Sequence, residues 1–280
     1  MKIGIIDVGG GTRGIFGAGV LDYLIDNNIE IPYCIGISAG SGNMARYISK
    51  DNKASYIFYT KYAFTKEYMS WRNYFVTGNF VNLNYIYGTL SNEGADYPLD
   101  YEKLMDSQQE LVVVATCAED GKPVYFTKKD IEKNDYRIFA CSSCLPVLCE
   151  PYYYEDHYYY DGAISNPIPV EKAFEDGCDK VIVILTRPID FIKSDGKKYL
   201  FYNKVRKRFP EFTKVLEKRC DIYNNQLKEI KEKYVENGKV LLIAPDSTKG
   251  LKTLSKDKKV FEKLYQEGYK KGELIKDFIK

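Results

Sequence analysis

Histidine is nearly absent from this chain. Its 280 residues include only His157, so any site that needs a histidine base depends on that side chain. Tryptophan is equally rare, with a single copy. A serine nucleophile is usually activated by a neighbouring histidine. The shortage of histidine therefore leaves the ordinary serine-histidine-aspartate chemistry with one candidate base.

Long apolar runs are missing as well. No stretch of about 18 apolar residues occurs, so we expect no membrane-spanning helix. The first residues, MKIGIIDVGGG, enter a strand and a glycine loop directly and lack the apolar core of a secretory signal. We therefore expect a cytoplasmic protein, with peripheral membrane contact as an open alternative.

The cysteines do not suggest a disulfide framework. Their number is odd and no secretory signal precedes them, so reduced thiols are expected. The seven are Cys34, Cys117, Cys141, Cys144, Cys149, Cys178 and Cys220. The close group Cys141, Cys144 and Cys149 resembles a zinc site with His157 as a fourth ligand, but a second Cys-x2-Cys pair is missing. We expect packed thiols there.

Charge of one sign does not dominate, because the formal net charge is only +2. The distribution is uneven, however. Residues 193–280 hold 24 Lys+Arg and 13 Asp+Glu, and residues 1–192 hold 17 and 26. The basic C-terminal region is explained by lysine-rich helix faces in solvent or by contact with anionic lipid headgroups. Nucleic acid is a third partner for such a charge, and we do not expect it.

Tyrosine, in contrast, is abundant, with 26 copies against 14 phenylalanines. Tyrosine suits interfaces and shallow apolar grooves, although a compositional bias of the genome would give the same excess. The densest run lies between positions 152 and 160. It is explained equally by contact with acyl chains or a bilayer and by two packed faces of a strand.

The apolar pattern predicts alternating strands and helices. Strand, helix, strand and helix are expected within the first 50 residues, which is typical of a parallel sheet with covering helices. The expected elements are strands at 2–7, 33–37, 111–118, 179–188 and 239–245, a hairpin partner at 122–127, a short strand that ends in a turn at 152–164, and helices at 15–27, 39–50, 169–177, 197–236 and 256–280. The aromatic segment 51–100 is expected to cap the sheet. One α/β domain over residues 1–280 is the simplest interpretation.

The stretch IGISAG follows the second strand and precedes the second helix. It places Gly36, Ser38 and Gly40 in the Gly-x-Ser-x-Gly spacing of a nucleophile elbow, in which the glycines allow a tight turn around a strained serine. The helix N-terminus there favours a developing negative charge. The structural alternative is a helix that begins at small residues, with Ser38 as its N-cap.

The first strand ends in DVGGGTRG, a loop whose glycine amides can bind an anion. Gly9, Gly11 and Gly14 have the Gly-x-Gly-x-x-Gly spacing of a dinucleotide phosphate loop. That function requires an acidic residue at the end of the next strand, whereas Glu30 lies before the strand. The serine elbow at the end of that strand favours an oxyanion hole instead.

A third stretch, Asp161-Gly162-Ala163, follows the aromatic run. A carboxylate at a strand end beside a glycine could meet Ser38, although Asp-Gly is more often a simple turn.

Together these three stretches resemble the patatin-like phospholipase family of serine acyl hydrolases, over roughly residues 2–190. The resemblance implies a three-layer α/β/α fold with a mostly parallel central sheet and a Ser-Asp dyad without histidine. Ser38 would be the nucleophile and Asp161 the general base. The loop Gly9, Gly10, Gly11, Thr12, Arg13 and Gly14 would form the oxyanion hole, with the amides of Gly10, Gly11 and Thr12 as donors. The motif positions Gly36, Gly40, Gly162 and Ala163 would shape the two turns. It further implies hydrolysis of lipid acyl esters without a metal or organic cofactor.

His157 fits poorly as a triad base. In α/β-hydrolases the histidine follows both the serine and the acid in the chain, whereas His157 precedes Asp161. Four residues along a strand also span about 13 Å. We expect His157 to be a surface or packing residue.

The sequence therefore predicts a serine hydrolase of lipid esters, similar to a phospholipase A or lysophospholipase. A short-chain carboxylesterase, a non-catalytic protein that binds lipid or a partner, and a nucleotide-binding protein remain as alternatives.

Overall fold

The computed structural model describes residues 1–194, 202–248 and 250–280. Its centre is a sheet of eight strands. The strands are β1 (Ile3–Asp7), β2 (Tyr33–Ile37), β3 (Glu110–Cys117), β4 (Pro123–Thr127), β5 (Tyr152–Tyr154), β6 (His157–Asp161), β7 (Lys180–Ile184) and β8 (Val240–Ile243). The helices of at least five residues are α1 (Ile15–Asp26), α2 (Ala39–Ile48), α3 (Ala54–Thr60), α4 (Trp71–Thr77), α6 (Tyr101–Asp106), α7 (Arg137–Ser143), α8 (Val170–Glu175), α9 (Asn203–Arg208), α10 (Pro210–Ile230), α11 (Lys258–Lys271) and α12 (Leu274–Phe278), with two π-helical stretches, η3 (Ile86–Leu90) and η7 (Lys231–Val235). Shorter turns are α5 (Leu83–Tyr85), η1 (Gly11–Gly14), η2 (Tyr62–Phe64), η4 (Lys128–Asp130) and η5 (Gly162–Ile164).

Five strands form the parallel part of the sheet, in the order β3-β2-β1-β7-β8. Their residues are apolar on both faces, as expected for a parallel sheet that is buried on both sides. Along β1, for example, Ile5 faces one hydrophobic cluster and Ile6 the other. The predicted parallel sheet is confirmed. Because Asp7 pairs with both Gly36 and Ile184, the carboxyl ends of β1, β2 and β7 lie at one level.

The antiparallel strands position the far end of the sheet. Strand β4 pairs with β3 over Val112–Thr116, which confirms the predicted hairpin. On β3, residues 110–114 pair with β2 and residues 115–117 pair with β6. Since a strand has only two edges, β2 and β6 follow one another along the edge opposite β4. The end of β6 therefore meets the end of β2.

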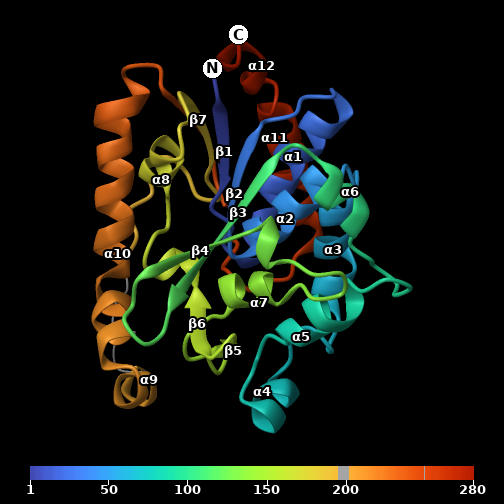
Figure 1. Ribbon diagram of the computed structural model, residues 1–280, viewed down its shortest axis with the longest axis vertical. Helices are drawn as coiled ribbons and strands as arrows, with labels where there is room; N and C mark the ends of the chain where they lie inside the picture. Colours follow the sequence, from blue (N-terminus) through green and yellow to red (C-terminus); the bar gives the residue numbers. More distant parts are fainter. Residues whose placement is uncertain (195–201, 249) are drawn as a thin grey trace.

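Helices cover both faces of the sheet, so the predicted three layers are confirmed (Figure 1). Helices α1, α2 and α11 bury Phe16, Met44 and Phe261 in the cluster on one face. Helices α8 and α10 cover the other face with side chains such as Val170 and Leu227. The run at 152–164, predicted as one short strand, is instead the hairpin β5–β6. Its turn places Glu155 and Asp156 at positive φ.

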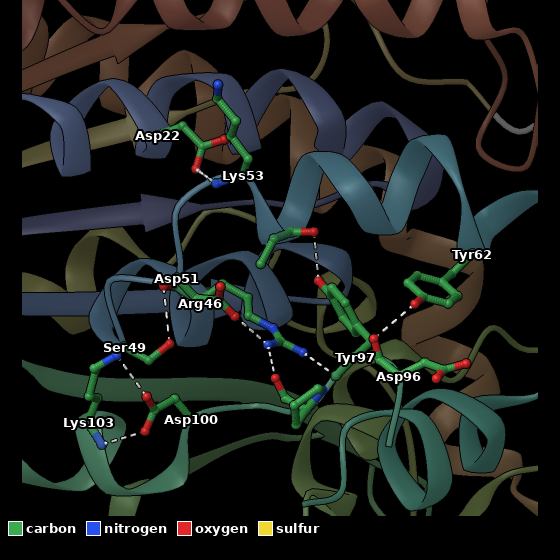
Figure 2. Close-up of polar contacts among 12 residues, drawn as sticks. Asp22, Arg46, Ser49, Asp51, Lys53, Tyr62, Asp96, Tyr97, Asp100 and Lys103 are labelled. Atoms are coloured by element: carbon green, nitrogen blue, oxygen red, sulfur yellow. Dashed lines mark hydrogen bonds and ion pairs between the residues drawn. The ribbon is translucent and has the colours of Figure 1, made fainter. Parts of the chain in front are cut away.

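The aromatic segment 51–100 does not lie on the sheet as predicted. Its helix α3 packs against α1, α2 and α11, so the segment covers a helical layer. Arg46 of α2 holds the end of the segment (Figure 2). Its guanidinium donates to the carbonyl oxygens of Tyr97 (2.9 Å) and Pro98 (2.5 Å) and pairs with Asp51 at 2.6 Å. It also stacks 3.9 Å above the Tyr97 ring.

The C-terminal region is joined to the same core. Strand β8 extends the sheet beside β7, and α11 packs against α1. The two helices cross closely. A Cβ atom on Gly268 would lie 2.1 Å from the Phe16 carbonyl oxygen, and one on Gly19 would lie 2.2 Å from that of Tyr265. The prediction of a single domain is compatible with this packing and stays a prediction.

Candidate active site

Ser38 lies in the turn between β2 and α2 with a strained backbone, at φ 54° and ψ −131°. Positive φ is costly for any residue with a Cβ and persists only where neighbours hold it. The Ser38 amide donates to Ser142 Oγ (2.8 Å), which in turn donates to the carbonyl oxygen of Val114 (2.6 Å). The Ser38 carbonyl oxygen accepts from Ser41 Oγ (2.6 Å). This is the geometry of a nucleophile elbow.

The flanking glycines are required by close backbone contacts. A Cβ atom on Gly40 would lie 2.2 Å from the Asp7 carbonyl oxygen. One on Gly36 would lie 2.3 Å from the Ser41 Cα. Both distances are far below a normal contact, so Gly36 and Gly40 allow β1, β2 and α2 to approach. Ser38 does occupy the N-cap position of α2, but its side chain makes no capping hydrogen bond.

The glycine loop after β1 lies beside this elbow. Gly9, Gly10 and Gly11 have φ values of 63°, 117° and 60°, a region that favours glycine. The Gly9 amide donates to Asp7 Oδ1 (2.9 Å), and the Thr12 amide donates to the Thr253 carbonyl oxygen (2.8 Å). Among the described residues, the Gly10 and Gly11 amides have no acceptor. They are therefore the two donors that an oxyanion could use, whereas the Thr12 amide is already engaged.

The remaining loop residues have different surroundings. Arg13 is buried, donates from Nη1 to Thr253 Oγ1 (3.0 Å) and lines the larger cavity described below. The Gly14 carbonyl oxygen accepts from Asn43 Nδ2 (3.0 Å), where α1 begins. Thr12 and Gly14 do not line that cavity. They hold the loop in place.

Asp161 ends β6 and is only 4% exposed. Its carboxylate accepts from the Ala163 amide (2.9 Å). Burial raises the pKa of the Asp161 carboxyl to about 6, although hydrogen bonds from Ser38 and the Ala163 amide and the charge of Lys193 lower it in part. Gly162 is required here, since a Cβ atom would lie 2.1 Å from the Val114 carbonyl oxygen. The structure thus brings Ser38 and Asp161 together, as the register of β2 and β6 on β3 requires.

His157 is far from this arrangement. It occupies the exposed start of β6, at the opposite end of the strand from Asp161, which confirms the expected surface position. Cys141, Cys144 and Cys149 are buried thiols, as predicted. Across residues 1–194, 202–248 and 250–280, no group of three or more His, Cys, Asp and Glu side chains could hold a metal ion.

Other residues of the site were not predicted. Ser142 supports the Ser38 amide from α7, and Thr253 holds the glycine loop from the C-terminal region. Asp7 is fully buried and accepts from Asn43 Nδ2 (2.8 Å) as well as from the Gly9 amide. Burial raises the pKa of this carboxyl to about 6. Only Asp7, two residues before the first of the three glycines, carried a local signal in the sequence.

Ser38 separates two cavities. The larger has a volume of about 440 Å³, in the range of small-molecule sites, and is lined by both Ser38 and Asp161. The smaller has a volume of about 70 Å³ and extends under the aromatic segment toward Tyr59 and Tyr87. Gly11, Leu145 and Leu254 line both. An extended ligand could therefore place its reacting atom at Ser38 and a part on either side.

The larger cavity is lined by both apolar and cationic side chains. Val147, Leu148 and Phe191 are among its apolar residues. Its cations are Arg13, Arg187, Lys193 and Arg219. Burial and the nearby charge of Arg187 lower the pKa of Arg13 to about 10, so Arg13 remains charged at neutral pH. Asp161 is the single acidic residue among the described lining residues.

The sequence model of the patatin-like phospholipase family matches residues 8–174, which include the glycine loop, the elbow and Asp161. The chain belongs to the patatin-like phospholipase family. Residues 209–279 of this patatin-like chain also match a family described only as a domain of unknown function.

A curated relative is the uncharacterized protein YjjU of Escherichia coli (strain K12). It is 28% identical over 192 residues, which cover 67% of this chain and 52% of YjjU. The patatin-like chain thus spans about half the length of that relative. Among solved structures, VipD from Legionella pneumophila aligns with a TM-score of 0.47 and 13% identity, over 99% of this chain and 67% of VipD.

Proposed function

We propose that this patatin-like protein is a serine hydrolase of lipid acyl esters that uses Ser38 as nucleophile and Asp161 as general base. The observation that carries the proposal is the meeting of a strained serine and a buried carboxylate in one cavity, beside two glycine amides that have no acceptor among the described residues. Each part of an acyl-transfer site is thus represented: nucleophile, base and oxyanion donors.

The proposed reaction has two halves. Ser38 Oγ attacks the ester carbonyl carbon while its proton passes to the Asp161 carboxylate. The amides of Gly10 and Gly11 donate to the oxyanion that forms. When the tetrahedral intermediate collapses, the alcohol leaves with the proton from Asp161. Water then attacks the acyl-serine, gives its proton to Asp161, and the fatty acid is released as Ser38 Oγ regains a proton.

The pKa of Asp161 suits this role. A carboxyl with a pKa of about 6 is mostly ionised at pH 7 and is a stronger base than an ordinary aspartate. Its position is fixed by the Ala163 amide, so the carboxylate does not need to reorganise during proton transfer.

The cavity favours a lipid over a short-chain ester. A volume of about 440 Å³ with an apolar side accommodates more than an acetyl or butyryl group. Arg13 and Arg187 on the same cavity favour a phosphate-bearing alcohol as the leaving part. A phospholipid combines both features, whereas a short-chain carboxylesterase needs neither.

A fluorophosphonate probe tests the proposed nucleophile. Wild-type protein should be labelled, and Ser38→Ala should abolish labelling. Ser143→Ala is the matched control, because this half-buried serine lines the smaller cavity together with Ser38 but lies outside the proposed machinery. Wild-type protein that remains unlabelled and hydrolyses no ester would refute the hydrolase proposal and favour a binding protein.

The substrate is tested separately with nitrophenyl esters of increasing chain length and with intact and lyso-phospholipids. We expect long chains to be preferred. Arg187→Gln should raise KM for an anionic phospholipid several-fold and leave KM for a nitrophenyl ester nearly unchanged. A preference for acetyl or butyryl esters would favour the carboxylesterase instead.

A further inference from the structure

Helix α4 exposes large apolar side chains to solvent. Trp71, Phe75 and Val76 are 61%, 81% and 74% exposed, which makes them some of the most exposed large hydrophobic residues of the described chain. We call these three side chains the apolar tip. They are grouped on one short helix. The centroid of the Trp71 ring lies 6.5 Å from that of Phe75 and 5.0 Å from that of the more buried Phe80. A contiguous apolar group of this kind usually marks an interaction site.

The helix that carries the tip is held in place by ordered local contacts. Ser70 caps α4 by accepting from the Asn73 amide (3.2 Å), and Gly78 ends it at φ 76°. Met69 and Val81, on either side of the segment, form a β-bridge and are both buried in a hydrophobic cluster. The exposure of the tip is therefore not explained by a loosely packed loop.

Cations lie near the tip, on α4 itself and on the neighbouring helix α9. Figure 1 shows α4 and α9 at the end of the molecule opposite both termini, and Glu150 connects them. Glu150 forms an ion pair with Lys204 of α9. It also packs against the end of α4, because a Cβ atom added to Gly78 would lie 3.0 Å from the Glu150 Cγ. Helix α9 carries Lys204, Arg206, Lys207 and Arg208 and no acidic residue, and Arg72 is exposed on α4 itself.

We propose that the apolar tip of α4 and the basic helix α9 form a surface that docks on an anionic lipid bilayer. Tryptophan and phenylalanine insert at the boundary between headgroups and acyl chains, and flanking lysine and arginine add attraction to anionic lipids. The cations explain why this partner is favoured over a second copy of the chain. Two copies joined at this surface would bring two basic helices together, and a tip of three side chains is small beside the 20–30 residues per partner of a stable interface.

The docking surface is bonded to the wall of the larger cavity. The Phe80 amide, at the base of the tip, donates to the Leu148 carbonyl oxygen (2.7 Å), and Leu148 and its neighbour Val147 line that cavity. Docking would hold this cavity wall at the lipid surface and so bring the cavity close to its substrate. This consequence rests on the proposed function, whereas docking itself does not require that the protein hydrolyses lipid.

The chain contains one tryptophan, Trp71, so tryptophan fluorescence reports on the apolar tip alone. The experiment uses full-length Ser38→Ala protein, which cannot degrade the lipid, with vesicles of phosphatidylcholine or of phosphatidylcholine mixed with phosphatidylglycerol. We expect the Trp71 emission to shift to shorter wavelength and to become protected from acrylamide with the mixed vesicles. Unchanged emission with both vesicle types, or equal affinity for the two, would overturn the proposal.

Two variants and their controls locate the surface. Phe75→Ser combined with Val76→Ser should weaken binding to the mixed vesicles at least 10-fold, because both side chains lose their buried area in the lipid. Lys207→Glu should weaken it several-fold. The controls are Leu274→Ser, a 53% exposed leucine of α12 at the opposite end, and Lys263→Glu of α11, which should bind as the parent does.

Three other outcomes of these vesicle experiments would also decide between the explanations. If the tip variant binds as tightly as its Leu274 control, the tip is not the docking surface. An emission shift that grows with protein concentration without vesicles would replace the bilayer by a second copy. Vesicle binding by a wild-type protein that hydrolyses no ester would support the docking surface and refute only the proposed hydrolysis.

Discussion

At the scale of single residues, the proposed site depends on a carboxyl group whose ionised form is destabilised by burial in the fold. Asp161 is almost completely buried, and its direct partners are the Ala163 amide and Ser38. An environment that raises the pKa of a carboxyl destabilises the ionised form and makes it a better base. Two measurable consequences follow, one for activity and one for stability.

The activity should fall in acid with the titration of Asp161. Because the base must be ionised, kcat/KM should decrease tenfold per pH unit below about 6, well above the 3.8 of an ordinary aspartate. A histidine would give a similar limb, so the profile is measured on His157→Ala as well. That variant should retain both the activity and the limb, and Asp161→Asn should lose about 10²–10⁴-fold in kcat. Loss of the limb in His157→Ala would assign it to the histidine and refute the dyad.

The same carboxylate should lower the stability of the fold at neutral pH. Since its pKa is raised in the folded state, its contribution favours folding below pH 3.8 and is lost as the pH rises through about 6. Asp161→Asn keeps an acceptor for the Ala163 amide without the charge. We expect it to raise the free energy of unfolding at pH 8 by about 1–3 kcal/mol, an order-of-magnitude figure from the pKa shift, with no gain near pH 4.

Denaturant unfolding of Asp161→Asn at pH 8 and pH 4 measures this gain. Asp106→Asn, at an exposed position at the end of α6, is the control and should change little. A variant that is less stable than wild-type at pH 8 would show that the Asp161 carboxylate is not a cost to the fold.

At the scale of elements, local patterns predicted the pieces of the site and long-range register joined them. The strand-turn-helix pattern around Ser38 and the three glycines after β1 are local, so the sequence indicated both turns. The placement of β6 after β2 along one edge of β3 depends on pairings between residues more than 40 positions apart, and no local pattern specifies them. Thr253 reaches the glycine loop across 241 positions, for the same reason unpredicted.

The aromatic segment 51–100 was predicted to lie on the sheet, whereas its helix α3 packs on a layer of helices. The prediction failed because the aromatic residues of the segment show no clear helical or strand periodicity. Its attachment is instead set by Arg46, a buried residue of α2 whose role the sequence did not indicate. Figure 2 shows this guanidinium among the backbone carbonyl groups of the segment, where Tyr97 also donates from its hydroxyl to the Ala54 carbonyl oxygen (2.9 Å). A buried guanidinium with several acceptors fixes one arrangement of the chain.

Replacing Arg46 should therefore loosen the segment. Arg46→Met would leave the Tyr97 and Pro98 carbonyl groups and Asp51 without their donor, and we expect a loss of about 2–4 kcal/mol in the free energy of unfolding. Lys103→Gln removes the exposed ion pair with Asp100 in the same region and should have little effect. Denaturant unfolding compares the two. Equal, small losses would mean that the segment is held by its aromatic packing alone.

At the scale of the whole molecule, the two matched family regions share one core. Residues 8–174 contain the proposed catalytic groups, and residues 209–279 match a family of unknown function. Nevertheless β8 pairs with β7, α10 covers one face of the sheet, and α11 packs on α1. The carbonyl oxygen of Thr253 also holds the glycine loop of the site. The C-terminal region thus supplies both a layer of the fold and a contact in the proposed active site.

A chain that ends at residue 190 should therefore fail to fold. Removing α10 would uncover Val181 and Val183 of β7 and their neighbours, and removing α11 would uncover α1, so large apolar surfaces would meet water. We expect the fragment to be insoluble or rapidly proteolysed and not to react with a fluorophosphonate, while the full chain resists proteolysis. A fragment that is compact and reacts with the probe would show that residues 209–279 are an appended unit. Folding without labelling would instead assign them a role limited to the site, through Thr253 and the glycine loop.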